Sequence, residues 1–335
     1  MESEFDFINH IKNRTSAVRS PQSAVRFGIG DDCAVLSKDA KTDLVMTTDL
    51  LVEDVDFRFD WITPEFLGHK ALAISLSDIA AMGAKPVWAM LSVGVPARIW
   101  KTDFVERFYD GWFAPAKKFN VELVGGDVSR TPDKIVVDSI AAGEAKKNKA
   151  VLRSGARDGD LIFVTGALGG SAAALKLLES GERFEKSAHK NLLLRQLQPQ
   201  PQTEVGQILG EKNLATAMID LSDGLSSDLA HLCQASNVGA KIYADKIPLD
   251  VNFKNLSRSK KYKTFFSDNL NFALNGGEDF ELLFTVNPKK VSRLKEELKN
   301  FSFSHIGEMT ANVEMIELSG GEKTEILHAN GFRHF

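Results

Sequence analysis

Apolar residues are densest in the segment that follows Thr63, where they occupy nearly every side of a predicted helix. Thr63, Pro64 and Glu65 form a helix start, because threonine caps the first turn, proline suits the first helical position and an acid favours the positive end of the helix dipole. The helix is predicted to continue to about Met82, with Asp78 in its last turns. Since a helix that is apolar all round is usually buried, we expect it to lie between layers of the structure.

Short apolar runs on both sides of this helix predict strands, and amphipathic runs predict further helices. The predicted strands cover residues 44–46, 87–95, 121–124, 135–142, 161–165, 214–219 and 280–286. The other predicted helices cover residues 4–13, 103–118, 172–178, 223–233 and 291–298. Pro115 should kink or shorten the second of these helices. Because strands and helices are interspersed without a regular alternation, the pattern predicts an α+β (mixed α/β) fold rather than a Rossmann fold.

The length of 335 residues allows two domains of ordinary size, each with its own core. A charged, lysine-rich turn at residues 146–149 is typical of a linker between domains. We therefore expect an N-terminal domain over residues 1–148 and a C-terminal domain over residues 149–335.

The composition is that of a soluble globular protein, with 43% hydrophobic and 26% charged residues. A net charge of −4 argues against non-specific nucleic-acid binding. Residues 1–6 lack the basic and apolar regions of a signal peptide, and no stretch approaches the roughly 18 apolar residues of a membrane span. The two cysteines, Cys33 and Cys233, lie far apart. We expect a cytoplasmic protein with reduced thiols and without nucleic-acid or membrane partners.

Aspartates recur where short apolar segments stop, in both halves of the chain. The first two, Asp31 and Asp32, follow a glycine-rich turn at residues 28–30. Further aspartates end the segments at residues 46–49, 76–78, 124–127 and 219–223. Our central hypothesis is that the fold gathers these distant segments into one oxygen-rich pocket for divalent cations and polyphosphate.

The residue types in these segments limit the possible chemistry. The chain has no P-loop motif, no complete dinucleotide-binding glycine pattern, no H-E-x-x-H and no paired C-x-x-C. What remains are carboxylates and hydroxyls, which are hard ligands suited to Mg²⁺ or Ca²⁺ rather than to zinc. An EF-hand would need several acids within one 12-residue loop, whereas Mg²⁺ typically uses one or two carboxylates together with substrate phosphates. The dispersed acids therefore favour Mg²⁺.

Each of these segments also has an ordinary structural explanation. Gly-Asp and Asp-Gly pairs are frequent in turns, Asp49 could be a cap, and Asp78 could be a buried acid with satisfied hydrogen bonds. The glycine-rich loop at residues 166–170 could be a plain connection from a strand to a helix, although its amides could also hold a phosphate. It is the joint recurrence of the acids that favours a site.

In this order, the motifs resemble those of the thiamine-monophosphate kinases. The resemblance is carried by G-I-G-D-D (28–32), T-T-D (47–49), L-S-D-I-A-A-M-G-A (76–84), V-G-G-D (124–127), R-S-G-A (153–156), D-L-S-D-G-L (220–225) and G-G-E-D (276–279). It covers nearly the whole chain. The segment 76–84 is typical of an ATP-binding superfamily that includes aminoimidazole ribonucleotide synthetase, selenophosphate synthetase and a hydrogenase maturation protein. The first and last motifs narrow the resemblance to the kinase.

The resemblance implies a homodimer formed through the sheet of the N-terminal domain, with a C-terminal domain that closes over the nucleotide. It implies transfer of the γ-phosphoryl group of ATP to thiamine monophosphate, with the help of several Mg²⁺ ions. The implied metal ligands are Asp31, Thr47, Thr48, Asp49, Asp78, Asp127, Asp220 and Asp223. The implied ATP contacts are Tyr109, Gly126, Asp127, Arg153 and Ser222, of which Asp127 and Arg153 are also the implied catalytic residues. The implied acceptor contacts are Glu278, Phe332 and, by its position in the motif, Asp56.

One position departs from the family pattern. The family often has E-G-V-H-F where this chain has E-D-V-D-F at residues 53–57, so Asp56 stands where a histidine would lie near the acceptor. An acid beside an anionic acceptor needs a cation or a different role. Two alternatives therefore stay open, a sibling ATP-dependent synthetase of the same fold and a catalytically inactive Mg²⁺–nucleotide-binding module. A selenophosphate synthetase would need a reactive cysteine near its N-terminus, and residues 1–26 contain none.

Overall fold

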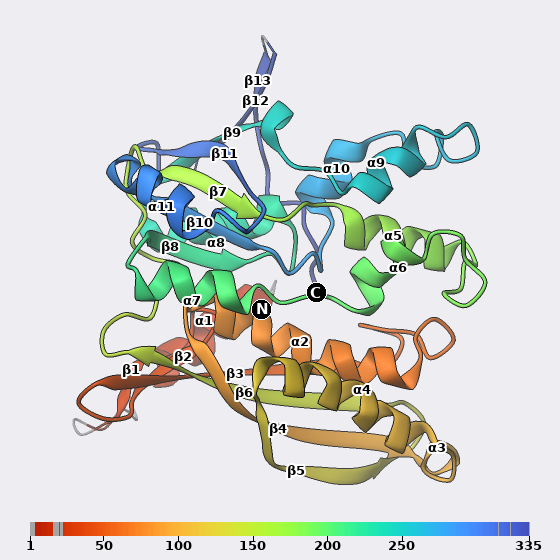
Figure 1. The fold of residues 1–335 in the computed structure, drawn as a ribbon. Helices are drawn as coiled ribbons and strands as arrows, with labels where there is room; N and C mark the ends of the chain where they lie inside the picture. Colours follow the sequence, from red (N-terminus) through yellow and green to blue (C-terminus); the bar gives the residue numbers. More distant parts are fainter. Residues whose placement is uncertain (1–3, 16–19, 21–22, 314, 322, 335) are drawn as a thin grey trace.

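The computed structural model describes residues 4–15, 20, 23–313, 315–321 and 323–334, which form two sheets with helices between and around them (Figure 1). The first sheet has the strand order β1-β2-β3-β6-β4-β5. Its strands are β1 (Val25–Phe27), β2 (Ala34–Ser37), β3 (Thr42–Val52), β4 (Lys85–Pro96), β5 (Glu122–Thr131) and β6 (Val136–Lys146). Only the β4–β5 pair is parallel within this sheet.

The second sheet has the strand order β13-β12-β9-β11-β7-β10-β8. Its strands are β7 (Leu161–Thr165), β8 (Ala215–Asp220), β9 (Gly239–Tyr243), β10 (Leu282–Val286), β11 (Phe303–Thr310), β12 (Ile316–Gly320) and β13 (Lys323–Ile326). The first sheet ends in sequence at Lys146 and the second begins at Leu161, so the expected domain boundary after residue 148 falls between them.

The helices occupy the space between the sheets and their outer sides (Figure 1). They are α1 (Glu4–Thr15), α2 (Pro64–Ala81), α3 (Ala97–Trp100), α4 (Phe104–Phe119), α5 (Gly170–Glu179), α6 (Lys190–Leu197), α7 (Thr203–Glu211), α8 (Leu225–Ser236), α9 (Val251–Ser257), α10 (Asn269–Asn275) and α11 (Val291–Glu297), with two 3-10 turns, η2 (Ala244–Lys246) and η3 (Pro288–Lys290). Among the described residues, no helix is both long enough and apolar enough to cross a lipid bilayer.

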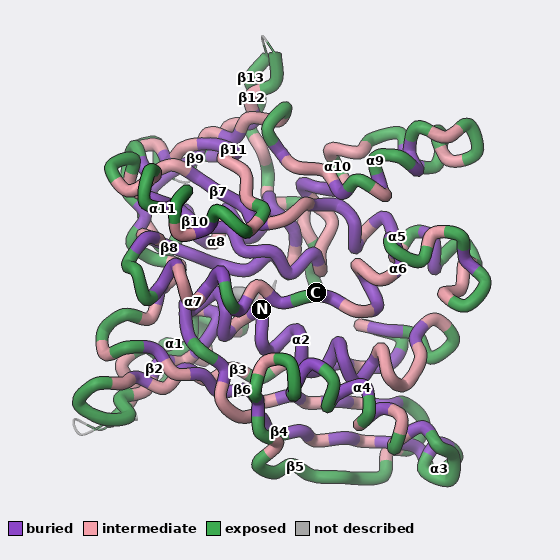
Figure 2. Tube along the Cα trace, in the orientation of Figure 1, coloured by how far each residue is buried: buried purple, intermediate pink, exposed green. Residues whose placement is uncertain are grey.

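Helix α2 lies at the centre of the molecule, as its all-round apolar pattern predicts. It begins as expected, with the side chain of Thr63 accepting a hydrogen bond from the amide of Phe66 and with proline in the first turn. It packs on β3, β6 and β4 of the first sheet and on β8 of the second, and Figure 2 shows it buried along its length. The helix therefore connects the cores of the two halves, and Asp78 sits in its last turns.

Helix α4 packs along α2 at close range. A Cβ atom at Gly68 would lie 1.9 Å from the carbonyl oxygen of Phe108, and one at Gly111 would lie 1.9 Å from that of Glu65, so both helices need glycine at the contact. The helix runs through Pro115 to Phe119, so it is not shortened there, and the other predicted outcome, a kink, stays a prediction. Packing of its apolar face against α2 outweighs the hydrogen bond that proline removes.

Two strands are longer than predicted, and this moves site residues away from strand ends. Strand β3 pairs with β6 over residues 42–52, so Thr47, Thr48 and Asp49 lie in its middle. Strand β5 pairs with β4 from Glu122 to Thr131 and includes Asp127. The prediction that these acids follow the ends of their strands is wrong, because pairing with a neighbouring strand extends both elements. The prediction is right for Asp220, which ends β8.

Candidate active site

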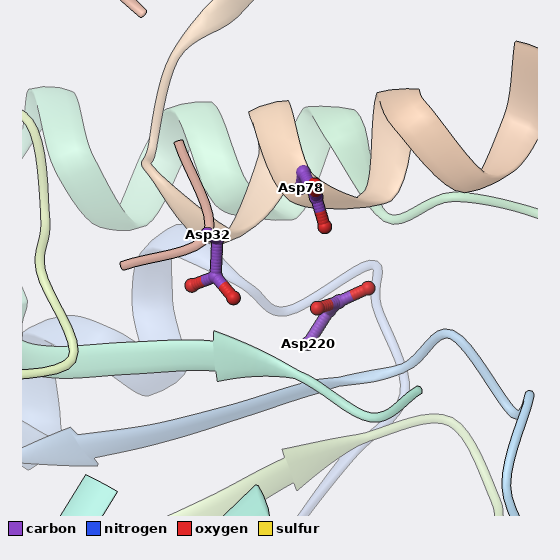
Figure 3. A group of neighbouring side chains, drawn as sticks. All are labelled: Asp32, Asp78 and Asp220. Atoms are coloured by element: carbon purple, nitrogen blue, oxygen red, sulfur yellow. The ribbon is translucent and has the colours of Figure 1, made fainter. Parts of the chain in front are cut away.

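Three carboxylates from distant parts of the chain meet between the two halves of the molecule. Asp32 lies in the turn before β2, Asp78 lies near the end of α2, and Asp220 ends β8. One carboxylate oxygen from each lies within 4.8 Å of the others, and Figure 3 shows the three side chains pointing toward one space. We call these three residues the acid triad. Because Asp220 comes from the second sheet, both halves of the chain build it.

Hydroxyl groups hold two members of the acid triad in place. Ser77 Oγ donates to Asp220 Oδ2 at 2.5 Å, a contact between α2 and the second half. Thr47 Oγ1 donates to Asp78 Oδ2, so a β3 side chain orients the helix carboxylate. In contrast, Asp32 Oδ2 is buried and has no hydrogen-bond partner among the described residues. An unpaired buried carboxylate oxygen beside two other carboxylates is a donor that suits a hard cation.

The triad is electrostatically strained without a cation. Burial, with the negative charge of Asp32, raises the pKa of Asp220 from 3.8 to about 7. Burial and the neighbouring charges of Asp49 and Asp220 raise the pKa of Asp78 well above its usual value. Like charges this close cannot all ionise unless a cation offsets their repulsion. The donors are all oxygen, which fits Mg²⁺ or Ca²⁺.

Arg153 approaches the triad from the segment that precedes β7. Its Nη2 and Nε atoms donate to Asp32 Oδ1 at 2.5 and 3.1 Å. Its backbone amide points at Asp31, with N–O distances of 3.2 and 3.3 Å. Burial lowers the pKa of Arg153, but the hydrogen bond to Asp32 and the charges of Asp32, Asp31 and Asp220 together outweigh it, so the guanidinium stays cationic. Burial and the charge of Asp32 raise the pKa of Asp31 to about 7.

Asp49 and Asp223 border the triad. Asp49 Oδ2 accepts a hydrogen bond from Ser75 Oγ at 2.7 Å, and burial raises its pKa to about 6. Asp223 follows Ser222 in the turn between β8 and α8, and burial raises its pKa as well. The structure thus gathers Asp31, Thr47, Asp49, Asp78 and Asp220 around Asp32, and Asp223 lies in the turn that follows Asp220.

A cavity of about 470 Å³ opens beside these acids. Asp49, Ser222 and Asp223 line the end near the triad, and Trp61 and Leu175 are among the residues that line the rest. The three residues expected to contact an acceptor all line it as well, namely Asp56, Glu278 and Phe332.

A buried lysine fixes the position of Glu278. Lys70 of α2 is 1% exposed, and its Nζ lies 2.6 Å from Glu278 Oε1. Gln196 donates to the other carboxylate oxygen of Glu278, whose backbone has a positive φ of 64°. Asp56 accepts a hydrogen bond from the amide of Val52 at 2.8 Å. Burial raises the pKa of Asp56, although that hydrogen bond and the nearby charges of His334 and Lys70 oppose the rise.

Two family models match the chain in succession. The first, described as the AIR synthase related protein N-terminal domain, covers residues 30–145, and the second, its C-terminal domain, covers residues 157–317. Proteins named thiamine-monophosphate kinase from Escherichia coli (strain K12) and Bacillus subtilis (strain 168) are 38% and 35% identical over 99% of this chain, and the matches cover 98% and 99% of those proteins. The chain belongs to the thiamine-monophosphate kinase family.

The fold of the thiamine-monophosphate kinase family extends over the whole described chain. A solved structure described as "AaThiL complexed with AMPPCP and TMP" matches this chain with a TM-score of 0.83 and 32% sequence identity. The match covers 99% of this chain and 97% of the solved chain. Both the family resemblance and the two-domain α+β fold predicted from the motifs are therefore confirmed.

Several residues expected from the thiamine-monophosphate kinase resemblance lie away from the triad. Successive residues of a strand face opposite sides of the sheet, so Thr48 points away from Thr47 and donates to Asp138 Oδ1 at 2.7 Å. Asp127 lies on the edge strand β5, which β6 and β4 separate from β3 by about 14 Å. Gly126 precedes it, and Tyr109 lies on α4, packed against Phe113. One copy of the chain does not bring these residues to the acid triad.

The glycine-rich loop at residues 166–170 is filled by the protein itself. The Asp279 carboxylate accepts hydrogen bonds from the amides of Gly169 at 2.6 Å and Ser171 at 3.1 Å, at the start of α5. Arg195 Nη2 lies 3.1 Å from Glu281, which neighbours the same loop. The loop is thus the strand-to-helix connection considered above, because a carboxylate occupies the position that a phosphate would take.

Sequence reasoning missed two residues of this site. Asp32 completes the triad, although only its neighbour Asp31 was expected to be a ligand; the pair of adjacent carboxylates was the available signal. Lys70 lies on the same apolar helix as Asp78, and a charge on a helix predicted to be buried is costly unless it is paired, so its position was the available signal.

Proposed function

We propose that this chain transfers the γ-phosphoryl group of ATP to the phosphate of thiamine monophosphate, which gives thiamine diphosphate and ADP. The observation that carries the proposal is the acid triad beside a cavity lined by carboxylates and aromatic rings, in a member of the thiamine-monophosphate kinase family. The relative solved with AMPPCP and TMP supports the two ligands.

The oxygen donors around the triad suit Mg²⁺, and Asp32, Asp78 and Asp220 are the residues proposed to hold it. Asp31, Thr47, Asp49 and Asp223 border the same space. When bound, the ions neutralise the charge of the phosphates and orient them. The chain itself supplies the fixed geometry, because Ser77, Thr47 and Ser75 each restrain one carboxylate.

The proposed reaction needs no general base from the protein. The second pKa of a phosphate monoester is about 6, so the acceptor is mostly dianionic at pH 7. An acceptor oxygen attacks the γ-phosphorus, and the bond from that phosphorus to the β–γ bridging oxygen breaks as ADP leaves. At roughly 4 Å and an effective dielectric constant near 20, each pair of like charges costs about 4 kcal/mol. Arg153, held by Asp32, lies where it can stabilise charge on the transferred group.

The proposed acceptor site is the cavity beside the triad. Asp56 presents negative charge to a cationic thiazolium ring, and Phe332, which is 50% exposed, presents an aromatic face. Glu278, whose charge Lys70 offsets, supplies carboxylate oxygens as hydrogen-bond acceptors. This gives Asp56 a role that does not oppose the anionic phosphate.

Both cysteines are free thiols, which agrees with a cytoplasmic enzyme.

We infer that the ATP site is completed by a second copy of the chain. Leu50, Asp138, Ser92 and Asp127 form one row across the first sheet, on the face opposite α2. Leu50 is 59% exposed on this face, and β5 leaves one edge of the sheet unpaired. A homodimer formed through this sheet would cover both, and Gly126 and Asp127 on the edge strand β5 are the residues proposed to act beside the partner's triad.

Mixed dimers test this arrangement. Asp127→Asn and Asp220→Asn should each inactivate the homodimer, while a co-purified heterodimer of the two variants should recover activity at one of its two sites. The matched control is a heterodimer of Asp78→Asn with Asp220→Asn, which has no intact triad on either chain and should stay inactive. Equal inactivity of both heterodimers would contradict a shared site.

The assay for the proposed function is direct. The chain is incubated with Mg²⁺, ATP and thiamine monophosphate, and thiamine diphosphate and ADP are measured by chromatography. Equal amounts of both products are expected, with neither formed when the metal is chelated. ADP release without thiamine diphosphate would point to a sibling synthetase, and no turnover at all would point to a nucleotide-binding module.

A further inference from the structure

The last described residues of the chain form a strap over the entrance to the cavity. Backbone amides of the strap donate to the turn before α8 and to its first residues: Asn330 to Ser226 Oγ at 3.2 Å, Gly331 to Ser227 Oγ at 3.0 Å, and Phe332 to the carbonyl oxygen of Asp223 at 3.0 Å. A Cβ atom at Gly331 would lie 2.3 Å from that carbonyl oxygen, so only glycine allows this approach. The strap thus has a defined register on α8.

This register places two rings in the cavity. Phe332 and His334 both line it, with ring centroids 4.9 Å apart in an edge-to-face arrangement. Arg333 lies between them in sequence but does not line the cavity, and its Nη2 donates to the carbonyl oxygen of Ala329. Phe332 and His334 therefore line the cavity, whereas Arg333 lies outside its lining.

His334 is an available donor beside acids that already have partners. Lys70, the buried cation of this cavity, is paired with Glu278. His334 has no hydrogen bond or ion pair to any other described residue, and its charge lowers the pKa of both Asp56 and Asp223. The imidazole, Asp56 and Asp223 all line the same cavity.

We propose that His334 is an acceptor-binding residue whose imidazole donates a hydrogen bond to the phosphate of the acceptor, while Asp56 and Phe332 contact its cationic ring. This rests on the proposed function and assigns the two charges of one zwitterionic substrate to different side chains of the cavity. Ser226 and Ser227 of α8 act as positioning residues, because their hydroxyl groups accept the hydrogen bonds that set the register of the strap.

Paired ligands test this assignment by equilibrium titration of the full chain with Mg²⁺ and AMPPCP. Thiamine monophosphate and thiamine differ only in the phosphate, so a donor to that group affects one and not the other. His334→Ala should weaken binding of thiamine monophosphate roughly tenfold, about 1.4 kcal/mol, and leave binding of thiamine within about twofold. His334→Gln, which keeps an N–H donor, should recover part of the loss.

Two matched variants of the strap complete the experiment. Phe332→Ala should weaken both ligands equally, because it removes a contact to the ring that they share. Arg333→Ala should change neither. Equal weakening of both ligands by His334→Ala would overturn the proposal, since His334 would then only support Phe332, and so would unchanged binding of both. Turnover of thiamine monophosphate by the wild type is measured first, so that failure of the proposed function is distinguished from failure of this inference.

Discussion

Asp220→Asn should stabilise the metal-free protein at neutral pH, although it removes a residue of the proposed metal site. Asp220 is 3% exposed, and its pKa is raised from 3.8 to about 7 by burial and by the charge of Asp32. A shift of this size destabilises the folded state by about 4 kcal/mol once the carboxylate is ionised. Asparagine keeps a partner for Ser77 Oγ and carries no charge.

The sign of the effect sets its pH dependence. Because the folded-state pKa is raised, the folded protein binds the proton more tightly than the unfolded chain. The penalty is absent below pH 3.8, grows to about 1 kcal/mol at pH 4.5 and is complete above pH 7. The stabilisation by Asp220→Asn should therefore be large at pH 8 and small at pH 4.5.

Thermal unfolding followed by circular dichroism measures both effects. At roughly 2 °C per kcal/mol for a chain of this size, the variant in EDTA at pH 8 should unfold about 8 °C above the wild type. Added Mg²⁺ should raise the Tm of the wild type and not that of the variant. Asp110→Asn, which removes the same charge from the exposed side of α4, is the matched control and should change little.

A Tm for Asp220→Asn below that of the wild type in EDTA at pH 8 would refute this prediction, because repulsion among the three carboxylates would then not destabilise the folded protein. An equal rise in Tm with Mg²⁺ in the wild type and the variant would show that Asp220 does not contribute to the metal site.

Other outcomes follow from the same contacts. Asp127→Asn should abolish turnover and leave the circular dichroism spectrum unchanged, and a rate above roughly a tenth of the wild type would contradict its role. Phe332→Ala should raise the KM for thiamine monophosphate far more than the KM for ATP in steady-state assays. Equal increases would mean that the ring only packs against the C-terminal domain and does not contact the acceptor. Asp279→Ala leaves the amides of Gly169 and Ser171 unpaired, so the free energy of unfolding in urea should fall by about 2 kcal/mol near pH 4, where the buried carboxyl of the wild type is protonated and carries no charge penalty. An unchanged denaturation midpoint would contradict this assignment.

Local pattern was enough to predict α2 and its start. The Thr63 cap, the proline that follows and the all-round apolar sequence each point to a buried helix, and the structure confirms this. Asp220 at the end of β8 was also predictable, because the apolar run stops there.

Residues whose placement depends on distant pairing were harder to predict. Thr47, Thr48 and Asp49 are consecutive, yet strand alternation sends Thr48 to the opposite face of the sheet. Recognising this requires knowing that β3 continues through these residues, which only its pairing with β6 decides. Similarly, the glycine-rich loop before α5 offers amides to an anion, and only the fold shows that Asp279 provides it.

Helix α2 joins the cores of both halves, and the hydrogen bond from Ser77 to Asp220 joins them again at the triad. A cation at this position would bind tightly only after both domains have folded and docked. Occupancy of the triad would then report on the docking of the two domains, because the first half of the chain alone supplies only Asp32 and Asp78.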